Sequence, residues 1–441
     1  MENILHLKAP GDWINDPNGF IYFRGTYHLF YQYFPCAPVW GTMHWGHAIS
    51  TDLIHWKHLG IALYPTKEYD RNGVFSGSAI EKKGKLYLYY TAERYLEEDP
   101  ENCTVPLDWK ALQSQAMICS EDGITFDNVK GKCQIIPPIE DTSVADPQDC
   151  RDPKVWYEEE KYYMCLGSTC RKKEGVLLLY TSDDGENWKY LNRLQDPQLG
   201  EILECPDLFA IEGQYFLMAS PIGILRGTEY PENQAVLQKI CFDSETGKTT
   251  LEKECRFLDY GMDLYAPQSN MDAEGRRTVM AWVRMPVPQS PEDNEAADGR
   301  PWSGMMALPR LIVLRNGQIC TPVHPAVRAY FTEEFCEKQS ISDSPKRWTR
   351  EGRTRIVTTL SEGQKIVISG VEIEFSEGCV RTDRSARIPA GVALHAKCRT
   401  PVIASAPKAA CELEIYVEKN LIEIFVNDGQ YVISNVLYPQ E

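Results

Sequence analysis

Apolar and polar residues alternate with a period of two over most of residues 1–300. Such alternation, broken by short turn-forming runs, is typical of antiparallel β-hairpins. Four hairpins rich in Tyr, Leu and Phe, and a weaker fifth, are predicted at 21–31, 79–90, 154–164, 207–217 and 275–282. Helical periodicity is scarce, so the pattern predicts an all-β fold.

A second signature, Ser-x-Asp followed four residues later by Trp or Phe, also repeats along this region. It occurs three times, with Ser50, Asp52 and Trp56, then Ser120, Asp122 and Phe126, and then Ser182, Asp184 and Trp188. We expect a turn in which Ser and Asp bond the backbone while the aromatic ring packs between sheets. Repeats of about 50 to 75 residues with four strands each are typical of a β-propeller. Five hairpin units predict five blades, whose inner strands meet around one axis.

The pattern changes after Pro288. Residues 291–300 are polar and acidic, which predicts an exposed loop, and alternating strands return beyond Phe331. The run from Asn427 to Gly429 follows one of these strands as a strong hairpin turn. We therefore predict a five-bladed β-propeller over residues 1–305, a linker over 306–330 and a smaller C-terminal β-sandwich over 331–441.

Composition narrows the possible partners. The 441 residues carry a formal net charge of -17, which argues against binding to nucleic acid or to an anionic membrane. The ligand is expected to be a neutral small molecule, or one held by a local basic pocket. Oligomeric state stays open between monomer and homodimer.

The sequence also indicates the cellular compartment of the protein. We recognise no signal peptide and no run long enough to span a membrane. The fifteen cysteines are an odd number scattered through predicted strands, which suits reduced thiols in the cytoplasm. Spacings typical of zinc ligands are missing, and we predict neither a metal nor a cofactor.

Three acids share one setting in the predicted repeats. Asp16, Asp152 and Glu204 each stand just before the first strand of a unit, and a Pro follows each within two residues. Equivalent positions on different blades converge on the axis of a propeller. Taken alone, each acid could equally be a turn residue, or, for Asp152, the partner of a neighbouring Arg.

Three carboxylates in one central pocket would repel one another. At least one would then have a raised pKa and carry a proton near neutral pH. A neutral acid beside an ionised one is the arrangement that glycoside hydrolysis requires.

The segments that hold these acids resemble the three signature motifs of glycoside hydrolase family 32, the invertases and fructan hydrolases. These segments run from Trp13 to Gly19, from Arg151 to Pro153, and over Glu204 and Cys205. Further matches follow in the family's order over nearly the whole chain, at 30–33, 40–47, 50–56, 75–78, 265–268 and 423–429.

The resemblance implies a five-bladed propeller that carries a β-sandwich, and hydrolysis of β-fructofuranosides with retention of configuration. It implies that Asp16 is the nucleophile, that Glu204 is the general acid and base, and that Asp152 stabilises the transition state. It further implies a fructose pocket formed by Asn15, Gln32, Trp40, Phe75, Ser76 and Arg151. Core packing is the alternative for Trp40 and Phe75. We expect structural roles for His44, His47 and His55.

Two departures from the family are visible. The predicted sandwich is shorter than is usual, and the run from Phe34 to Cys36 stands where an Asn-Pro pair is expected. The first could change the number of strands in the sandwich, and the second could change the leaving-group side of the pocket. Neither departure involves the three acids.

We expect an intracellular enzyme that cleaves sucrose or short fructooligosaccharides. A sucrose-6-phosphate hydrolase is the alternative, and its phosphate would need basic residues such as Lys67, Arg71, Arg94 or Arg226. A propeller acting on arabinans is disfavoured by the segment from Trp13 to Gly19. Because all three acids are present, a catalytically silent carbohydrate-binding protein is also disfavoured.

Overall fold

The computed structural model describes residues 2–171, 173–225, 231–331, 336–337, 346–403 and 410–439. Strands dominate these residues, and they contain a single short α-helix, α1 (Pro325–Tyr330). The predicted all-β fold is confirmed. None of the helices in the described part of the chain is long and apolar enough to cross a membrane.

The first sheet has six strands in the order β1-β5-β4-β3-β2-β20. Its strands are β1 (Glu2–Ile4), β2 (Asp12–Phe23), β3 (Thr26–Phe34), β4 (His44–Ser50), β5 (His55–Leu63) and β20 (Trp302–Ser303). Strand β20 pairs with β2 in parallel, so a segment some 300 residues along the chain completes the sheet that the N-terminal strands begin.

Three four-stranded antiparallel sheets follow, each with its strands in chain order. The first contains β6 (Gly73–Lys82), β7 (Lys85–Tyr95), β8 (Ala111–Ser120) and β9 (Cys133–Ile136). The second contains β10 (Cys150–Glu158), β11 (Lys161–Cys170), β12 (Glu174–Ser182) and β13 (Lys189–Gln195). The third contains β14 (Ile202–Ile211), β15 (Gln214–Ile222), β16 (Val236–Phe242) and β17 (Thr249–Phe257). Three of the predicted hairpins, at 79–90, 154–164 and 207–217, lie within these sheets.

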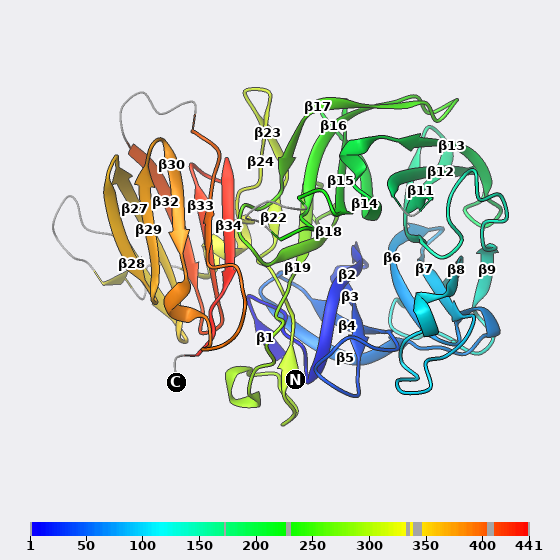
Figure 1. The fold of residues 1–441 in the computed structure, drawn as a ribbon, viewed down its shortest axis with the longest axis horizontal. Helices are drawn as coiled ribbons and strands as arrows, with labels where there is room; N and C mark the ends of the chain where they lie inside the picture. Colours follow the sequence, from blue (N-terminus) through cyan, green and yellow to red (C-terminus); the bar gives the residue numbers. More distant parts are fainter. Residues whose placement is uncertain are drawn as a thin grey trace.

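A further sheet closes the ring. It contains β18 (Leu264–Met271), β19 (Arg277–Val283) and β21 (Met305–Met306), with β22 (Arg310–Leu311) also paired to β19. We call β2, β6, β10, β14 and β18 the first strands of the five sheets. They contact one another in a closed cycle, β2 to β6, β6 to β10, β10 to β14, β14 to β18, and β18 back to β2. Figure 1 shows these sheets arranged around a common centre, which is the arrangement of a β-propeller.

The repeated Ser-x-Asp turns are confirmed as one structure used three times. In the first, the Ser50 hydroxyl accepts from Leu53 N at 2.8 Å, and Asp52 Oδ1 accepts from Ile54 N and His55 N at 2.8 Å each. The turns at Asp122 and Asp184 repeat these contacts. Each turn therefore satisfies its own backbone donors, which lets the following aromatic residue enter the space between sheets.

Two sheets packed face to face form the C-terminal sandwich. One contains β25 (Cys336–Glu337), β26 (Lys346–Arg350), β27 (Arg353–Ser361), β32 (Ala410–Val417), β33 (Leu421–Val426) and β34 (Tyr431–Val436). The other contains β28 (Gln364–Ile368), β29 (Val371–Ser376), β30 (Cys379–Asp383) and β31 (Lys397–Arg399). Buried aliphatic residues of both sheets fill the space between them. The expected hairpin turn joins β33 to β34, with positive φ from Asn427 to Gly429.

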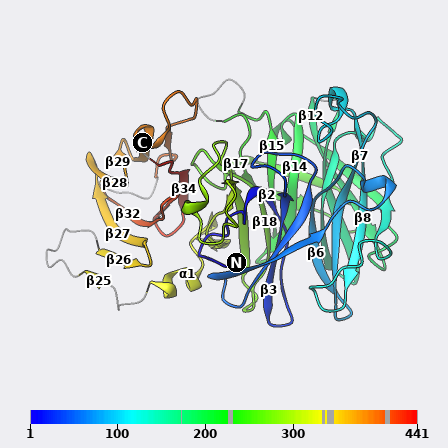
Figure 2. The same cartoon turned by 90° about the horizontal axis from the view of Figure 1, so that it is seen from below.

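The segment 306–330, expected to be a linker, contains secondary structure. Besides β22 and α1 it carries the hairpin of β23 (Val313–Arg315) and β24 (Gln318–Cys320). Figures 1 and 2 both show the sandwich beside the ring of sheets, with these short elements near the boundary between them.

The expectation of an exposed loop at 291–300 is wrong for several of its residues. Asp293, Asn294 and Ala296 are buried. The Asn294 side chain donates to the carbonyl of Ala9 at 2.6 Å and accepts from Asn3 Nδ2 at 3.0 Å. Polar residues can be buried where the fold supplies hydrogen-bond partners for them. Here the N-terminal segment supplies such partners.

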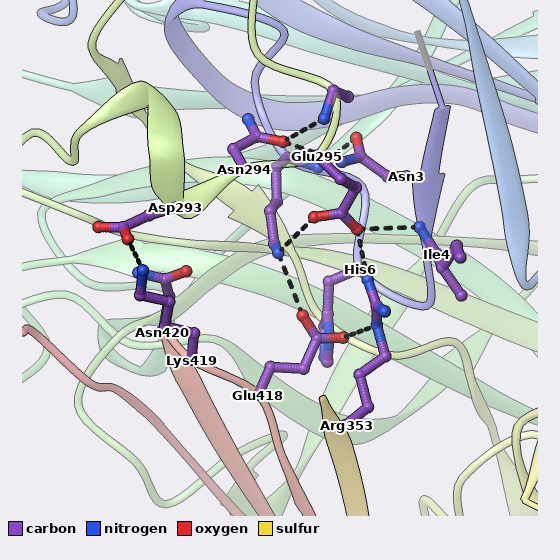
Figure 3. A network of polar contacts seen from close by, with 12 residues as sticks. Asn3, Ile4, His6, Asp293, Asn294, Glu295, Arg353, Glu418, Lys419 and Asn420 are labelled. Atoms are coloured by element: carbon purple, nitrogen blue, oxygen red, sulfur yellow. Dashed lines mark hydrogen bonds and ion pairs between the residues drawn. The ribbon is translucent and has the colours of Figure 1, made fainter. Parts of the chain in front are cut away.

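A buried network of charges joins the two ends of the chain (Figure 3). His6 lies between two sandwich carboxylates, with Nδ1 2.7 Å from Glu418 and Nε2 2.9 Å from Glu423. Lys8 lies 3.2 Å from both Glu295 and Glu418. Both ring nitrogens of a histidine donate only when it is charged, so the network requires a protonated His6. Burial opposes that charge, but Glu418 and Glu423 raise the pKa of His6 to about 9.

This network generates a stability prediction. His6→Gln removes the cation that two buried carboxylates share and leaves them only Lys8, Arg353 and Arg310, and we expect it to lower the free energy of unfolding by about 3 kcal/mol near pH 6. The pKa of His6 is raised on folding, so its contribution is fully present below its unfolded value and disappears as the pH rises through about 9. Thermal unfolding of both proteins at pH 6, 8 and 9.5 should show a shrinking difference in Tm.

His55→Gln is the matched control, because its ring also pairs with a carboxylate, Asp52, but is half exposed. Exposed pairs contribute about 0–1 kcal/mol. A difference between wild type and His6→Gln that stays constant with pH would contradict the role given to the charged imidazole.

Candidate active site

The first strand of every sheet in the ring carries a register shift at the same place. The shifts lie between Ile14 and Pro17 in β2, Phe75 and Gly77 in β6, Arg151 and Lys154 in β10, Glu204 and Asp207 in β14, and Tyr265 and Gln268 in β18. A β-bulge bends its strand and turns a side chain out of the regular alternation. Asp16, Ser76 and Asp152 lie inside these shifts, and Glu204 and Tyr265 lie at their edges.

These side chains meet in one cavity of about 530 Å³. All nine residues expected at the site line it, namely Asn15, Asp16, Gln32, Trp40, Phe75, Ser76, Arg151, Asp152 and Glu204. They come from the first, second and third sheets of the ring and from β14 of the fourth, so only the closed ring brings them together.

Asp16 is surrounded by neutral hydrogen-bond donors. Its Oδ2 accepts from the Ser76 hydroxyl at 2.6 Å and from the Cys205 thiol at 3.6 Å, and its Oδ1 accepts from Asn15 Nδ2 at 3.1 Å. Burial raises the pKa of Asp16 and the charge of Glu204 adds to this, whereas the bond from Ser76 opposes it. These donors fix the orientation of the carboxylate and favour its ionised form.

Asp152 adopts a backbone conformation that side chains other than Gly seldom occupy, with φ of 64°. Two hydrogen bonds hold it there: its own N–H donates to Thr91 Oγ1 at 2.9 Å, and Cys205 N donates to its Oδ2 at 2.8 Å. Burial raises the pKa of Asp152 to about 7, and the charges of Glu204 and Asp16 add to the effect against that of Arg151. The pKa values of Asp152 and Asp16 are thus both raised, as expected for carboxyl groups that share one cavity.

Glu204 has two different partners, one for each oxygen. Its Oε1 accepts from Arg151 at 3.2 Å from Nε and 3.0 Å from an Nη atom, and its Oε2 accepts from the Tyr265 hydroxyl at 2.8 Å. Arg151 also pairs with Asp149 at 2.8 Å. A charged fork and a phenol thus hold the Glu204 carboxylate in one orientation.

The residues expected to bind sugar have free polar and aromatic surface in the cavity. Gln32 donates to the carbonyl of Val74 at 3.2 Å, but its Oε1 is buried and has no partner. The rings of Trp40 and Phe75 pack edge to face at 6.0 Å, and both are partly accessible. Such a wall offers an acceptor for a hydroxyl and an apolar surface for a sugar ring.

The three histidines in the matched segments do not line the cavity. His47 bonds His28 at 3.1 Å and stacks on Phe30 at 4.1 Å. Burial lowers the pKa of His47 well below its usual value, so the ring is neutral. His44 bonds the Thr42 carbonyl and His55 bonds Asp52, which supports the structural roles expected for all three. Within the described residues no group of three or more His, Cys, Asp or Glu side chains could hold a metal ion.

The basic residues suggested for a phosphate lie elsewhere or outside the described residues. Lys67, Arg71 and Arg94 do not line the cavity, and Arg71 pairs with Glu68 and Glu98. Arg226 is not among the described residues. Arg151 is the only Lys or Arg among the described residues of the cavity wall, and two carboxylates already contact it.

Sequence reasoning missed several residues of the wall, among them Tyr265, Glu93, Gln113 and Trp109. Tyr265 has the same signal as the acids, because Pro267 follows it by two residues at the start of the last hairpin. Glu93 and Gln113 lie on the second and third strands of their sheet, and Trp109 lies in the connection between these strands. No repeated motif marks these three positions.

A ring of sheets whose axial cavity holds several carboxyl groups beside polar and aromatic side chains is an arrangement suited to a glycoside hydrolase. The models of the glycosyl hydrolases family 32 N-terminal and C-terminal domains match residues 6–322 and 363–441. The chain therefore belongs to glycoside hydrolase family 32, and it acts on β-fructofuranosides, releasing fructose. The propeller and the sandwich are those of this family.

Known relatives extend over nearly the whole chain. A raffinose invertase and a sucrose-6-phosphate hydrolase, both from Escherichia coli, are each 31% identical over 99% of this chain and 89% of their own. The solved β-fructofuranosidase of Bombyx mori superposes with a TM-score of 0.80 at 27% identity and covers 100% of this chain and 89% of its own. A variant of that protein has been solved in complex with sucrose.

Removal of the Tyr265 hydroxyl tests whether its hydrogen bond to Glu204 contributes to catalysis. We expect Tyr265→Phe to lower kcat/KM for sucrose by roughly 10-fold or more, because hydrogen bonds to charged groups contribute about 1.5–3 kcal/mol. Tyr89→Phe is the matched control: that hydroxyl is also buried, but it bonds the carbonyl of Gly185 outside the cavity. Steady-state kinetics of both variants decide the matter, and equal losses would argue against a direct role of Tyr265.

Proposed function

We propose that this protein removes the terminal fructosyl unit from sucrose and short fructooligosaccharides with retention of configuration. One observation carries the proposal: two carboxyl groups of one cavity have different partners. Neutral donors surround Asp16, whereas a guanidinium and a phenol hold Glu204. Retaining glycosidases divide the work between two such groups.

In the first step, Asp16 attacks the anomeric carbon of the fructosyl unit while the bond to the glycosidic oxygen breaks. Glu204 gives its proton to that oxygen, and the leaving sugar departs. In the second step Glu204 takes a proton from water, the water oxygen attacks the same carbon, and the bond to Asp16 breaks to release fructose.

The remaining wall binds the fructosyl unit. Asp152 exchanges hydrogen bonds with ring hydroxyls and stabilises the positive charge that develops on the sugar. The amides, the hydroxyl and the guanidinium of Asn15, Gln32, Ser76 and Arg151 hold the hydroxyl groups, while Trp40 and Phe75 cover the apolar face.

Charge favours a neutral leaving group over a phosphorylated one. The described wall contains five carboxyl groups, of Asp16, Glu93, Asp149, Asp152 and Glu204, and a single cationic side chain, that of Arg151. A phosphate dianion brought into such a cavity would meet repulsion without a free counter-charge. Sucrose 6-phosphate stays the second candidate substrate, because several relatives carry the name sucrose-6-phosphate hydrolase.

The proposal also covers the domain organisation of the chain and its location in the cell. We assign five blades to residues 1–305, which the closed cycle of five first strands supports, followed by a connecting segment over 306–330 and the sandwich over 331–441. The cysteines of the described residues are free thiols, which supports a location in the cytoplasm. The net charge of -17 supports the absence of nucleic-acid and membrane partners.

The two acids should respond differently to substitution. Asp16→Ala is expected to abolish turnover of sucrose, at least 1,000-fold by analogy with other nucleophiles, with its Tm close to that of wild type. Glu204→Ala is expected to lose activity on sucrose, and azide should restore turnover of a substrate whose leaving group needs no proton, because a small anion attacks the fructosyl-enzyme without a general base. Near-normal activity of Asp16→Ala would exclude it as the nucleophile.

A substrate series tests the leaving-group preference. We expect kcat/KM for sucrose and kestose to exceed that for sucrose 6-phosphate by at least roughly 10-fold, in line with the negative wall. Fructose release from the three substrates and from inulin should be measured with the same preparation. A preference for the phosphate would overturn the choice of a neutral sugar, and activity on none would overturn the proposed function itself.

A further inference from the structure

The connection between β7 and β8 reaches the mouth of the cavity. It runs over residues 96–110 and ends in a short 3-10 turn, Leu107–Trp109. Pro106 and Trp109 line the cavity, and so do Ala111 and Gln113 at the start of β8. No catalytic role has been assigned to this part of the wall.

Trp109 is presented to solvent there. Its relative exposure is 71%, the highest among the large exposed hydrophobic residues of the described chain. The indole ring also lines the mouth of the cavity, where an aromatic face can stack on the apolar side of a sugar ring.

The backbone around Trp109 is held in place. Asp108 and Trp109 have φ of 51° and 58°, a conformation that side chains other than Gly seldom adopt. Leu107 N bonds the carbonyl of Glu97 at 2.9 Å, Lys110 N bonds that of Leu107 at 3.1 Å, and Leu96 N bonds that of Lys110 at 3.0 Å. These bonds fix the backbone from which the indole ring projects.

Glu93 lies deeper in the same wall and has no part in the proposed chemistry. It is only 3% exposed, and its Oε2 is buried without a hydrogen-bond partner. Burial raises the pKa of Glu93 to about 8, while a bond from Gln113 and the charge of Arg151 lower it. The side chain is therefore mostly protonated at neutral pH and has an unused O–H or lone pair next to the cavity.

A chain of contacts connects Glu93 to the general acid. Gln113 donates to Glu93, its Oε1 lies 3.4 Å from an Nη atom of Arg151, and Arg151 holds Glu204. The leaving sugar departs from the side of the general acid, because Glu204 must reach the glycosidic oxygen. Arg151 and Glu204 thus stand at the boundary between the fructosyl unit and the leaving sugar, and Gln113 and Glu93, which lie beyond them, face the leaving sugar.

We infer that β7, β8 and their connection build a subsite for a neutral leaving sugar, in which Trp109 stacks on the sugar ring and Glu93 bonds one of its hydroxyls. This inference rests on the proposed function and adds the residues that select the leaving group. An indole face and an uncharged carboxyl group suit a hexose, as found in sucrose, or the next fructosyl unit of an oligosaccharide.

The test compares substrates with and without a leaving sugar. In β-fructofuranosyl fluoride the leaving group is fluoride, which cannot reach Trp109 or Glu93. We expect Trp109→Ala to lower kcat/KM for sucrose and kestose by roughly 3- to 10-fold, as for the loss of one aromatic contact, and to leave the fluoride within about 2-fold of wild type. Glu93→Leu, which removes the hydrogen-bonding group, should give the same selective loss, and Trp109→Phe should restore most of the activity on sucrose.

Leu96→Ala is the control within the same connection: Leu96 is 51% exposed but does not line the cavity, so all three rates should stay unchanged. Inhibition by glucose should weaken in Trp109→Ala, whereas inhibition by fructose should not. Equal losses on sucrose and on the fluoride, or no loss on either, would overturn the subsite. Failure of the wild type to hydrolyse both substrates would instead overturn the proposed function, so the two failures are distinguishable.

Discussion

The structure depends on one backbone constraint: every first strand of the ring leaves its regular pairing where it reaches the axis. The bulges turn the side chains of Asp16, Ser76 and Asp152 out of the regular alternation of their strands and towards a common cavity. Asp152, Cys205 and Ala266 adopt positive φ at these positions. Such conformations persist only where the surroundings fix them, and here the neighbouring strands of a closed ring do so.

The same crowding explains the electrostatics of the site. Carboxyl groups that share a cavity disfavour one another's charge. The cavity wall compensates with hydrogen-bond donors directed at individual carboxyl groups rather than with an excess of cations. Ser76, Cys205 and Tyr265 each donate to an acid, and Arg151 divides its charge between Glu204 and Asp149. The acids thereby receive distinct environments, as the different roles proposed for Asp16 and Glu204 require.

Much of this was readable from the sequence, because repeated motifs report on repeated structure. The hairpins, the Ser-x-Asp turns and the acids that precede a Pro all occupy equivalent positions on successive sheets, so their convergence could be predicted. Tyr265 obeys the same rule. Glu93 and Trp109 do not, since one lies on a second strand and the other in an irregular connection, and only the tertiary fold places them at the cavity. Asn294 was misjudged for a related reason: its buried partners lie some 290 residues away in sequence.

The pairing of His6 with Glu418 and Glu423 also bears on how the chain is made. Asp16 leaves the ribosome early, but β2 can pair with β20 only after residue 302 has been synthesised. His6 can pair with its two carboxylates only later still. Contacts between such distant residues form slowly, because a long loop must close before they stabilise anything. Assembly is therefore completed from the C-terminal end. A nascent chain that ends with β32, at Val417, would hold every residue of the proposed site, but His6 would lack both of its carboxylate partners.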